Sequence, residues 1–476
     1  MDELVVGIDL ATADVRATVC NASGDVVAHA ESPMPAPQRD GGRSLQQPAY
    51  WSAASEVLRA VTSSLGAAAG GIRGLSITGT SGTLVPCDRD GNPVGDASLY
   101  DDAVAVDQAR ALSDAGVAAG PTSPLARLGW LHRHAPAPLY VHTPDVVASV
   151  LLGELAPSDT SHALKGGIDP VAAVWDEDLL ALLGVPDEVV PALVHPGTEL
   201  GVVRAAVADD LGMPRGVRVV AGMTDGCTAQ IATGVVEVGS SVGVLGTTLV
   251  LKAVATDPVG GFGGTVYSHY APDGRFWPGG ASNVGAGVVR TEHPGADLQA
   301  MDATAAASGP ATVVRYPLPG KGERFPFSAP DATGFTVGEP RDATEAYRAL
   351  LEGVAFAERL GLETLGALGV ESTDHRVAGG ASASPVWNRI RASVLNRTLA
   401  RPAQPNSAFG AAVLAFATVS GAGLAASTRA MVRVAETIEP DATEVERLAD
   451  SYHVLLAELT RRGLRPSPVG LRATIS

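Results

Sequence analysis

Residues 4–28 have the sequence LVVGIDLATADVRATVCNASGDVVA, and this stretch indicates the fold class. An apolar strand over 4–10 and a short turn are followed by a second strand over 15–20. Residues 21–25 are typical of a hairpin turn and lead into a third strand. The stretch predicts an antiparallel meander at the start of an α/β protein.

The same pattern returns almost half the chain further on. Residues 242–245 are a second apolar strand, Gly246–Thr248 form a turn, and 249–252 continue as a strand. The repetition predicts two related domains, which we place at residues 1–239 and 240–476.

The remaining pattern predicts α/β elements throughout the chain. Apolar spacing predicts helices over 51–69 and 345–362 and a helix from Phe409 onward. A further helix is predicted after Ser384-Pro385, an N-cap followed by proline at the first helical position. Strands are predicted over 75–78, 217–221 and 376–378. The helix from Phe409 consists largely of small residues and is therefore suited to close packing.

Composition excludes several classes of protein. The 476 residues include 51 acidic and 34 basic side chains, and a formal charge of −17 argues against nucleic acid or an anionic membrane as the main partner. Cys20, Cys87 and Cys227 lie far apart, which excludes a disulfide framework or a cysteine zinc site. No signal-peptide pattern or apolar run of about 20 residues is present, so a soluble cytoplasmic protein is expected.

Two turns have the composition of phosphate-binding loops. Residues 11–13 and 246–248 are small, so their backbone N–H groups can approach an anion. Each alone is an ordinary turn between strands, but their equivalent places favour an ATP phosphate tail held from both sides. There is no P-loop motif, and the first strand lacks the G-x-G-x-x-G of a dinucleotide fold.

Two carboxylates could carry chemistry. Asp225 lies where a strand meets a helix N-terminus, where an acid is either structural or a general base. Asp9 closes a buried strand, and it either solubilises the strand end or holds a phosphate-bound Mg²⁺ through water. Gly379–Ala381 permits a flat ligand against the backbone, or forms only a turn.

Taken in order, these motifs resemble those of the FGGY carbohydrate kinases, which have an actin/hexokinase/Hsp70-like ATPase fold. The resemblance runs over about residues 5–421 and implies an α/β protein with two RNase H-like domains flanking a deep cleft. The matching motifs are Gly7–Thr12 and Gly246–Thr248 for phosphate, Gly222–Cys227 around the catalytic aspartate, and Ala378–Ala381 with Ser384–Asn388 for adenosine.

The resemblance implies ATP and Mg²⁺ as cofactors and a sugar as substrate. Asp225 would be the catalytic base and would also contact the sugar. Nucleotide contacts are implied at Asp9, Ala11, Thr12, Gly246, Thr247, Thr248, Gly379, Gly380, Ala381 and Asn388, with Asp9 also near the metal. Sugar contacts are implied at Thr80, Ser81, Asp102 and Lys165. Whether the chain forms a homodimer is left open.

Within that family the chain resembles the D-ribulose kinases of cyanobacteria and plants. The matching residues are Gly79–Thr83, Ala163–Lys165, Asp169-Pro170, Tyr267–His269, Gly279–Asn283 and Gly322–Pro326. The resemblance implies phosphorylation of O5 of D-ribulose. The alternatives are a kinase for D-xylulose or another ketose or polyol, a sugar-independent actin-like ATPase switch, and a sugar-binding pseudokinase.

Three positions bear on these alternatives. Xylulose kinases usually have a Gln-Met-His-Gly type loop where this chain has Thr80–Thr83, which favours ribulose. Ala11 stands where the first phosphate motif usually has Gly, and its methyl group restricts the backbone near the phosphates. Val104 stands where the family usually has the Arg of an Asp-x-Arg motif, so a guanidinium near the sugar is missing.

Overall fold

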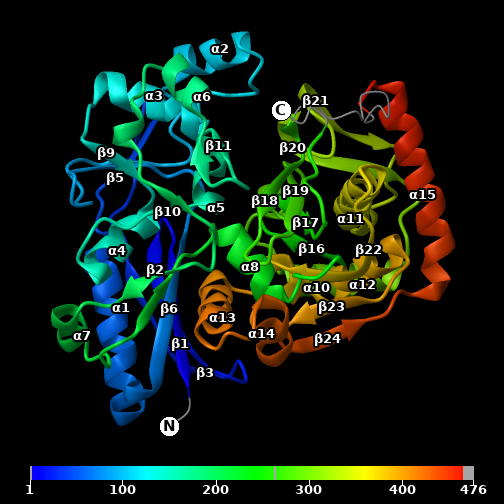
Figure 1. Ribbon diagram of the computed structural model, residues 1–476. Coiled ribbons are helices and arrows are strands. Elements are labelled where there is room, and N and C mark those ends of the chain that lie inside the picture. Colours follow the sequence, from blue (N-terminus) through cyan, green and yellow to red (C-terminus); the bar gives the residue numbers. More distant parts are fainter. Residues whose placement is uncertain (1–2, 262–263, 465–476) are drawn as a thin grey trace. The chain divides into compact units, whose positions relative to one another are not determined.

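The computed structural model describes residues 3–261 and 264–464, and packing divides the chain into two units (Figure 1). The first unit comprises residues up to 234 together with 269–274 and 404–433, and the remaining residues form the second. The first change of unit follows Gly234, and the chain later returns to the first unit twice. The domain boundary at residue 239 stays a prediction.

The first unit is built on a six-stranded sheet. Its order is β14 (Glu199–Val202), β15 (Arg218–Val220), β6 (Ile72–Gly79), β1 (Leu4–Leu10), β2 (Asp14–Asn21) and β3 (Val26–Pro33). Strands β1, β2 and β3 pair antiparallel, which confirms the predicted meander. Strand β6 is parallel to both β1 and β15.

Helices and short strands complete the first unit. The helices are α1 (Tyr50–Leu65), α2 (Val106–Asp114), α3 (Pro124–His134), α4 (Thr143–Leu152), α5 (Thr160–Ala163), α6 (Glu177–Leu182), α7 (Ala205–Leu211), α8 (Asp225–Thr233), α13 (Ser407–Val419) and α14 (Leu424–Met431). The short strands are β4 (Gln38–Asp40), β5 (Arg43–Gln46), β7 (Val85–Cys87), β8 (Ala97–Ser98), β9 (Leu139–Val141), β10 (Ser158–Asp159), β11 (Ile168–Asp169), β12 (Val174–Trp175) and β13 (Leu193–Val194).

Helix α1 is shorter than the predicted 51–69. Gly66 adopts φ 54°, a conformation that ends the helix, and residues Gly66–Gly71 continue as a 3₁₀ turn. Glycine adopts a positive φ without a steric penalty, so the regular helix ends at Gly66 although the three alanines that follow are good helix formers.

Helices α1 and α13 cover opposite faces of the first sheet (Figure 1). Leu4, Val6 and Ile8 point into one core cluster with apolar residues of α1. Gly7 points the other way, because successive strand residues alternate between faces, and a Cβ there would lie 1.8 Å from the Ala408 carbonyl of α13. Strand β1 is therefore buried on both faces.

The small-residue helix α13 packs as closely as its sequence predicts. A Cβ at Gly410 would lie 1.8 Å from the carbonyl oxygen of Thr228 in α8. The atom in the way belongs to the backbone, so it cannot move aside as the end of a flexible side chain would.

Gly410→Ala should therefore destabilise the protein, although alanine is the better helix former by about 1 kcal/mol. We expect overpacking to cost about 1–3 kcal/mol and to lower the melting temperature by several degrees. Gly366→Ala in α11 (Ala343–Ala367) is the matched control, because a Cβ there meets nothing within 4 Å and should leave the melting temperature equal or slightly higher. A Gly410→Ala protein that melts no lower than wild type would contradict this account of the packing.

The second unit is built on a seven-stranded sheet (Figure 1). Its order is β18 (Tyr267–Tyr270), β19 (Phe276–Ser282), β17 (Leu249–Ala253), β16 (Gly239–Leu245), β22 (Ser372–Ala378), β23 (Leu399–Pro402) and β24 (Val434–Ile438). The remaining elements are α9 (Gly287–Glu292), α10 (Leu298–Ser308), α11, α12 (Pro385–Leu395), α15 (Ala442–Arg461) and a hairpin of β20 (Val314–Glu323) with β21 (Ala329–Val337).

The two sheets share a strand plan, as the sequence repetition predicts. In the first, β1 pairs antiparallel with β2 and parallel with β6. In the second, β16 pairs antiparallel with β17 and parallel with β22. In each sheet the turn that follows the first strand, β1 or β16, therefore lies at the edge where the parallel strands have their carboxyl ends.

Within the described residues, none of the helices is both long and apolar enough to cross a membrane.

Candidate functional site

Three predicted site segments of the first unit meet at one edge of its sheet. Because β1, β6 and β15 are parallel, their carboxyl ends share that edge. The turn at Ala11-Thr12 follows β1, and residues 80–83, which we call the acceptor loop, follow β6. Asp225 comes soon after β15, and a parallel bridge joins Gly79 to Thr224, the residue before it. The fold therefore brings together groups far apart in sequence.

Asp9 lies on the face of β1 that α13 covers, since it is two residues beyond Gly7. It is buried, and its Oδ1 has no hydrogen-bond partner in the protein. Burial and then the charge of Asp225 raise the pKa of Asp9 to about 7, against the opposing charge of Arg16. Arg16 Nη1 lies 3.9 Å from Asp9 Oδ2, too far for a hydrogen bond.

This carboxylate has the features of a site for a bound cation. Among residues 3–261 and 264–464, no cluster of three or more His, Cys, Asp or Glu could hold a metal by itself. Mg²⁺ does not require one, because it is commonly held by one or two carboxylates with substrate phosphates and water. A buried carboxylate oxygen without a partner and a nearby second acid fit that mode of binding.

Asp225 begins α8 and is half-buried. Its Oδ1 accepts a hydrogen bond of 2.6 Å from the Gly226 backbone N–H. Its carbonyl accepts one of 3.1 Å from the Ser407 hydroxyl at the start of α13. The helix dipole favours the ionised carboxylate, so the side chain is suited to accept a proton from a bound alcohol.

The acceptor loop is held by the buried side chains of Arg127 and His162. The hydroxyls of Thr80 and Thr83 lie 2.8 Å apart. Arg127 of α3, which is fully buried, donates to the Gly82 carbonyl. His162 of α5 lies with its Nε2 3.2 Å from the Gly79 carbonyl. The loop that bears Thr80 and Ser81 is thus fixed at both ends.

Helix α5 also contacts the segment that leads to Asp225. Ser161 Oγ accepts a hydrogen bond of 3.2 Å from the Thr224 N–H. Asp159 caps α5 by accepting from the Ser161 and His162 N–H groups, each at 2.9 Å. A polar residue before a short helix is a recognisable cap in the sequence. Nothing in the local sequence reveals the contacts with Gly79 and Thr224.

The other two predicted sugar contacts differ in environment. Asp102 is fully buried, and its carboxylate oxygens accept from the Ser44 N–H at 3.2 Å and the Ser98 hydroxyl at 2.8 Å. Ser98 in turn accepts from Arg127 at 2.9 Å, so Asp102 belongs to the network behind the acceptor loop. Lys165 is exposed and follows α5 in the turn Leu164–Gly166.

The predicted nucleotide segments of the second unit also share a sheet edge. The turn Gly246–Thr248 follows β16, and Gly379 follows the parallel strand β22. Exposed Thr247 is held from two sides, since its carbonyl accepts from the Gly287 N–H at 3.0 Å and its hydroxyl from Arg290 at 2.7 Å. Gly379 has φ 87°, and a Cβ there would lie 2.5 Å from the Leu245 carbonyl, so glycine is required.

Gly380 and Asn388 play different structural parts. Gly380 and Ala381 lie in the turn after β22, and a Cβ at Gly380 would meet nothing within 4 Å, which leaves room for a ligand. Asn388 of α12 is fully buried, and its amide donates to the Ser382 carbonyl at 2.8 Å. Asn388 therefore supports this turn from within the unit.

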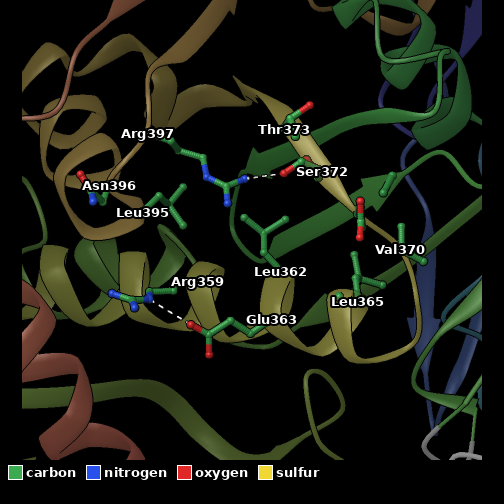
Figure 2. Close-up of a pocket in the computed structure, with 13 residues that line it drawn as sticks. Arg359, Leu362, Glu363, Leu365, Val370, Ser372, Thr373, Leu395, Asn396 and Arg397 are labelled. Atoms are coloured by element: carbon green, nitrogen blue, oxygen red, sulfur yellow. Dashed lines mark hydrogen bonds and ion pairs between the residues drawn. The ribbon is translucent and has the colours of Figure 1, made fainter.

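A cavity of about 540 Å³ in the second unit involves none of the predicted residues. Leu362 and Leu395 line it between the Arg359–Glu363 pair on one side and Arg397, which donates to the Ser372 carbonyl, on the other (Figure 2). It lies at the first residues of β22, at the end of that strand opposite to Gly379. Arginine and glutamate side chains both line the cavity, so its charge favours neither an anionic nor a cationic ligand.

Known proteins match the chain over both units. The model of the FGGY family of carbohydrate kinases, N-terminal domain, matches residues 4–232, and that of the C-terminal domain matches 242–419. A xylulose kinase of Bacillus subtilis is 24% identical, and the match covers 93% of this chain and 94% of the relative. The structure of a xyloylose kinase from Brucella ovis has a TM-score of 0.88 at 25% identity and covers 97% of this chain and 99% of its own. A gluconate kinase from Lactobacillus acidophilus has a TM-score of 0.86 at 20% identity, covering 97% and 98%.

Proposed function

This chain belongs to the FGGY family of carbohydrate kinases, and we propose that it transfers the γ-phosphoryl group of ATP to the terminal hydroxyl of a ketopentose. It is a phosphotransferase with an alcohol as acceptor, and its fold is the two-domain α/β fold of these actin-like kinases. The family uses ATP, whereas the sugar, the metal and the residue roles are parts of the proposal.

Xylulose is the first candidate for the acceptor. The Bacillus subtilis relative is named as a xylulose kinase and matches this chain over nearly its full length. The relatives reported above give no support to the expected subgroup of D-ribulose kinases. D-Ribulose is the second candidate because Thr80–Thr83 departs from the usual loop of xylulose kinases. The gluconate kinase structure has nearly the same fold, so the fold alone does not choose the substrate.

In the proposed reaction, the sugar hydroxyl attacks the γ-phosphorus in line. Asp225 accepts the proton of that hydroxyl, the new O–P bond forms, and the bond to the β-phosphate oxygen breaks to leave ADP. Backbone N–H groups at Ala11-Thr12 and Gly246-Thr247 bind phosphate oxygens, and Thr80 and Ser81 orient the sugar. Most of the rate enhancement then comes from positioning and electrostatics.

Mg²⁺ would supply positive charge to the phosphates, and Asp9 is the residue that would hold it, through water. The burial of Asp9 and its electrostatic interaction with Asp225 support this role. The position of the acceptor loop and Asp225 at one sheet edge is the observation that carries the proposal as a whole.

The substrate can be identified by ADP release from ATP·Mg²⁺ with a panel of sugars. D-Xylulose, D-ribulose, L-ribulose, L-xylulose, ribitol, xylitol, gluconate and glycerol should be compared with a blank without sugar. We expect the highest kcat/KM with D-xylulose or D-ribulose and little release in the blank. Equal turnover in the blank would instead support the ATPase switch, and no turnover with any sugar would contradict the proposed function.

A further inference from the structure

His162 is a buried histidine that takes no part in the proposed proton or phosphoryl transfer. It is 1% exposed, and both ring nitrogens have partners. Nδ1 lies 2.6 Å from Asp159 Oδ2, and Nε2 lies 3.2 Å from the Gly79 carbonyl oxygen. An ionised carboxylate and a carbonyl only accept hydrogen bonds, so this geometry favours a ring with hydrogen on both nitrogens, an imidazolium.

Electrostatics agrees with that geometry. Burial lowers the pKa of His162, but the charge and hydrogen bond of Asp159, followed by the charge of Asp145, raise it, and the net pKa lies above the ordinary value. Asp159 is also fixed, because its other oxygen accepts two backbone N–H groups of α5. The cation is therefore attached to a rigid helix start.

The two ends of this arrangement reach different parts of the proposed site. Gly79 is the last residue of β6, directly before the acceptor loop. Ser161, next to His162 in α5, binds the Thr224 N–H directly before Asp225. One short helix therefore holds the acceptor loop and the proposed base at a fixed separation.

We propose that His162 is a positioning residue, which fixes the acceptor loop relative to Asp225 by holding the Gly79 carbonyl. The proposal rests on the proposed function for its meaning in catalysis. A buried ion pair is seldom the most stable choice for an interior, because removing two charges from water is costly. A role in geometry accounts for a charged pair at this place.

Two substitutions separate the two hydrogen bonds of His162. The amide nitrogen of Gln lies near the position of Nε2, so His162→Gln retains a donor to Gly79. The amide nitrogen of Asn lies near the position of Nδ1, so His162→Asn retains a donor to Asp159 and loses the hydrogen bond to the Gly79 carbonyl. Both remove the charge. His142→Gln is the matched control, since His142 is equally buried nearby, with its Nδ1 2.9 Å from the Ser158 hydroxyl.

For His162→Asn, we expect kcat/KM for the sugar to fall roughly 10- to 100-fold, the size of one lost buried hydrogen bond to a charged donor. The KM for ATP should stay within about twofold, because the change lies on the acceptor side. His162→Gln should retain kcat/KM within about fivefold of wild type, and the control should do the same. If His162 were merely structural, His162→Asn and His162→Gln would lose kcat/KM equally, and the decrease in the folded fraction would account for both losses. That result would overturn the proposal.

Amide hydrogen exchange gives a readout that does not depend on turnover. In His162→Asn, residues 80–83 and 224–226 should exchange faster than in wild type, whereas His162→Gln and His142→Gln should leave them nearly unchanged. If wild type shows no sugar-stimulated turnover, the proposed function fails, and exchange alone decides the positioning role. Unchanged exchange in both segments of His162→Asn would overturn it.

Discussion

Asp225→Asn should lower sugar-stimulated ADP release by roughly 10²–10⁴-fold, the usual contribution of a general base. The amide has nearly the shape of the carboxylate but cannot accept the hydroxyl proton. Asp225 is half-buried at the start of α8, so the fold should survive the change. The affinity for ATP, measured by calorimetry, should also survive, since the nucleotide contacts lie at other residues.

The control for this variant addresses the alternative that Asp225 is only a first-turn acid. Asp107 occupies the first turn of α2 and is exposed, so Asp107→Asn removes a comparable helix-dipole interaction without touching the site. We expect Asp107→Asn to keep kcat within about twofold. Equal activities of the two variants, both within a few fold of wild type, would leave Asp225 with a structural role alone.

Asp9→Asn should make the protein less active and more stable. The pKa of Asp9 in the folded protein is about 7, above the 3.8 of an ordinary aspartate, so the folded state favours the protonated form. For an acid with a raised pKa, stability is greatest at low pH and falls as pH rises from about 4 through about 7. At pH 8 and in the absence of metal, the ionised carboxylate of Asp9 lowers the free energy of unfolding by roughly 2–4 kcal/mol. The neutral amide of Asn carries no such penalty.

Thermal unfolding without Mg²⁺ at several pH values measures this effect. Wild type and Asp9→Asn should have similar melting temperatures near pH 4. At pH 8 the melting temperature of the variant should be higher than that of wild type. Sugar kinase activity of the variant should fall at least 10-fold, because a neutral amide holds a hydrated cation weakly. A variant that is less stable than wild type at pH 8 and equally active would contradict both the burial argument and the metal role.

The sequence predicts the strands and their turns because these depend on local patterns. The apolar run over 4–10, the alternation over 15–20 and the hairpin turn at 21–25 predict β1, β2 and β3, and the repeat at 242–252 predicts β16 and β17. Once β1 and β6 are known to be parallel, the shared edge of the acceptor loop and Ala11-Thr12 follows from geometry. The signal is strongest at β1, because that strand is buried on both faces and its residues are correspondingly apolar.

The supports of the site could not be predicted because their partners are distant in sequence. His162 meets Gly79 and Arg127 meets Gly82 across 83 and 45 residues, and no spacing rule connects them. Asp102 illustrates the same difficulty. Its acidic neighbourhood suggests contact with sugar hydroxyls, but the fold buries it behind Ser44 and Ser98. Whether it also reaches a bound sugar stays a prediction.

Transfer of the phosphoryl group from ATP to a sugar is tested by measuring both products of the reaction in one sample. Purified protein is incubated with ATP·Mg²⁺ and D-xylulose or D-ribulose, and ADP and sugar phosphate are quantified together by mass spectrometry. We expect one sugar phosphate per ADP, with almost no ADP when sugar is omitted. ADP formed at the same rate without sugar, or without a matching sugar phosphate, would contradict this expectation.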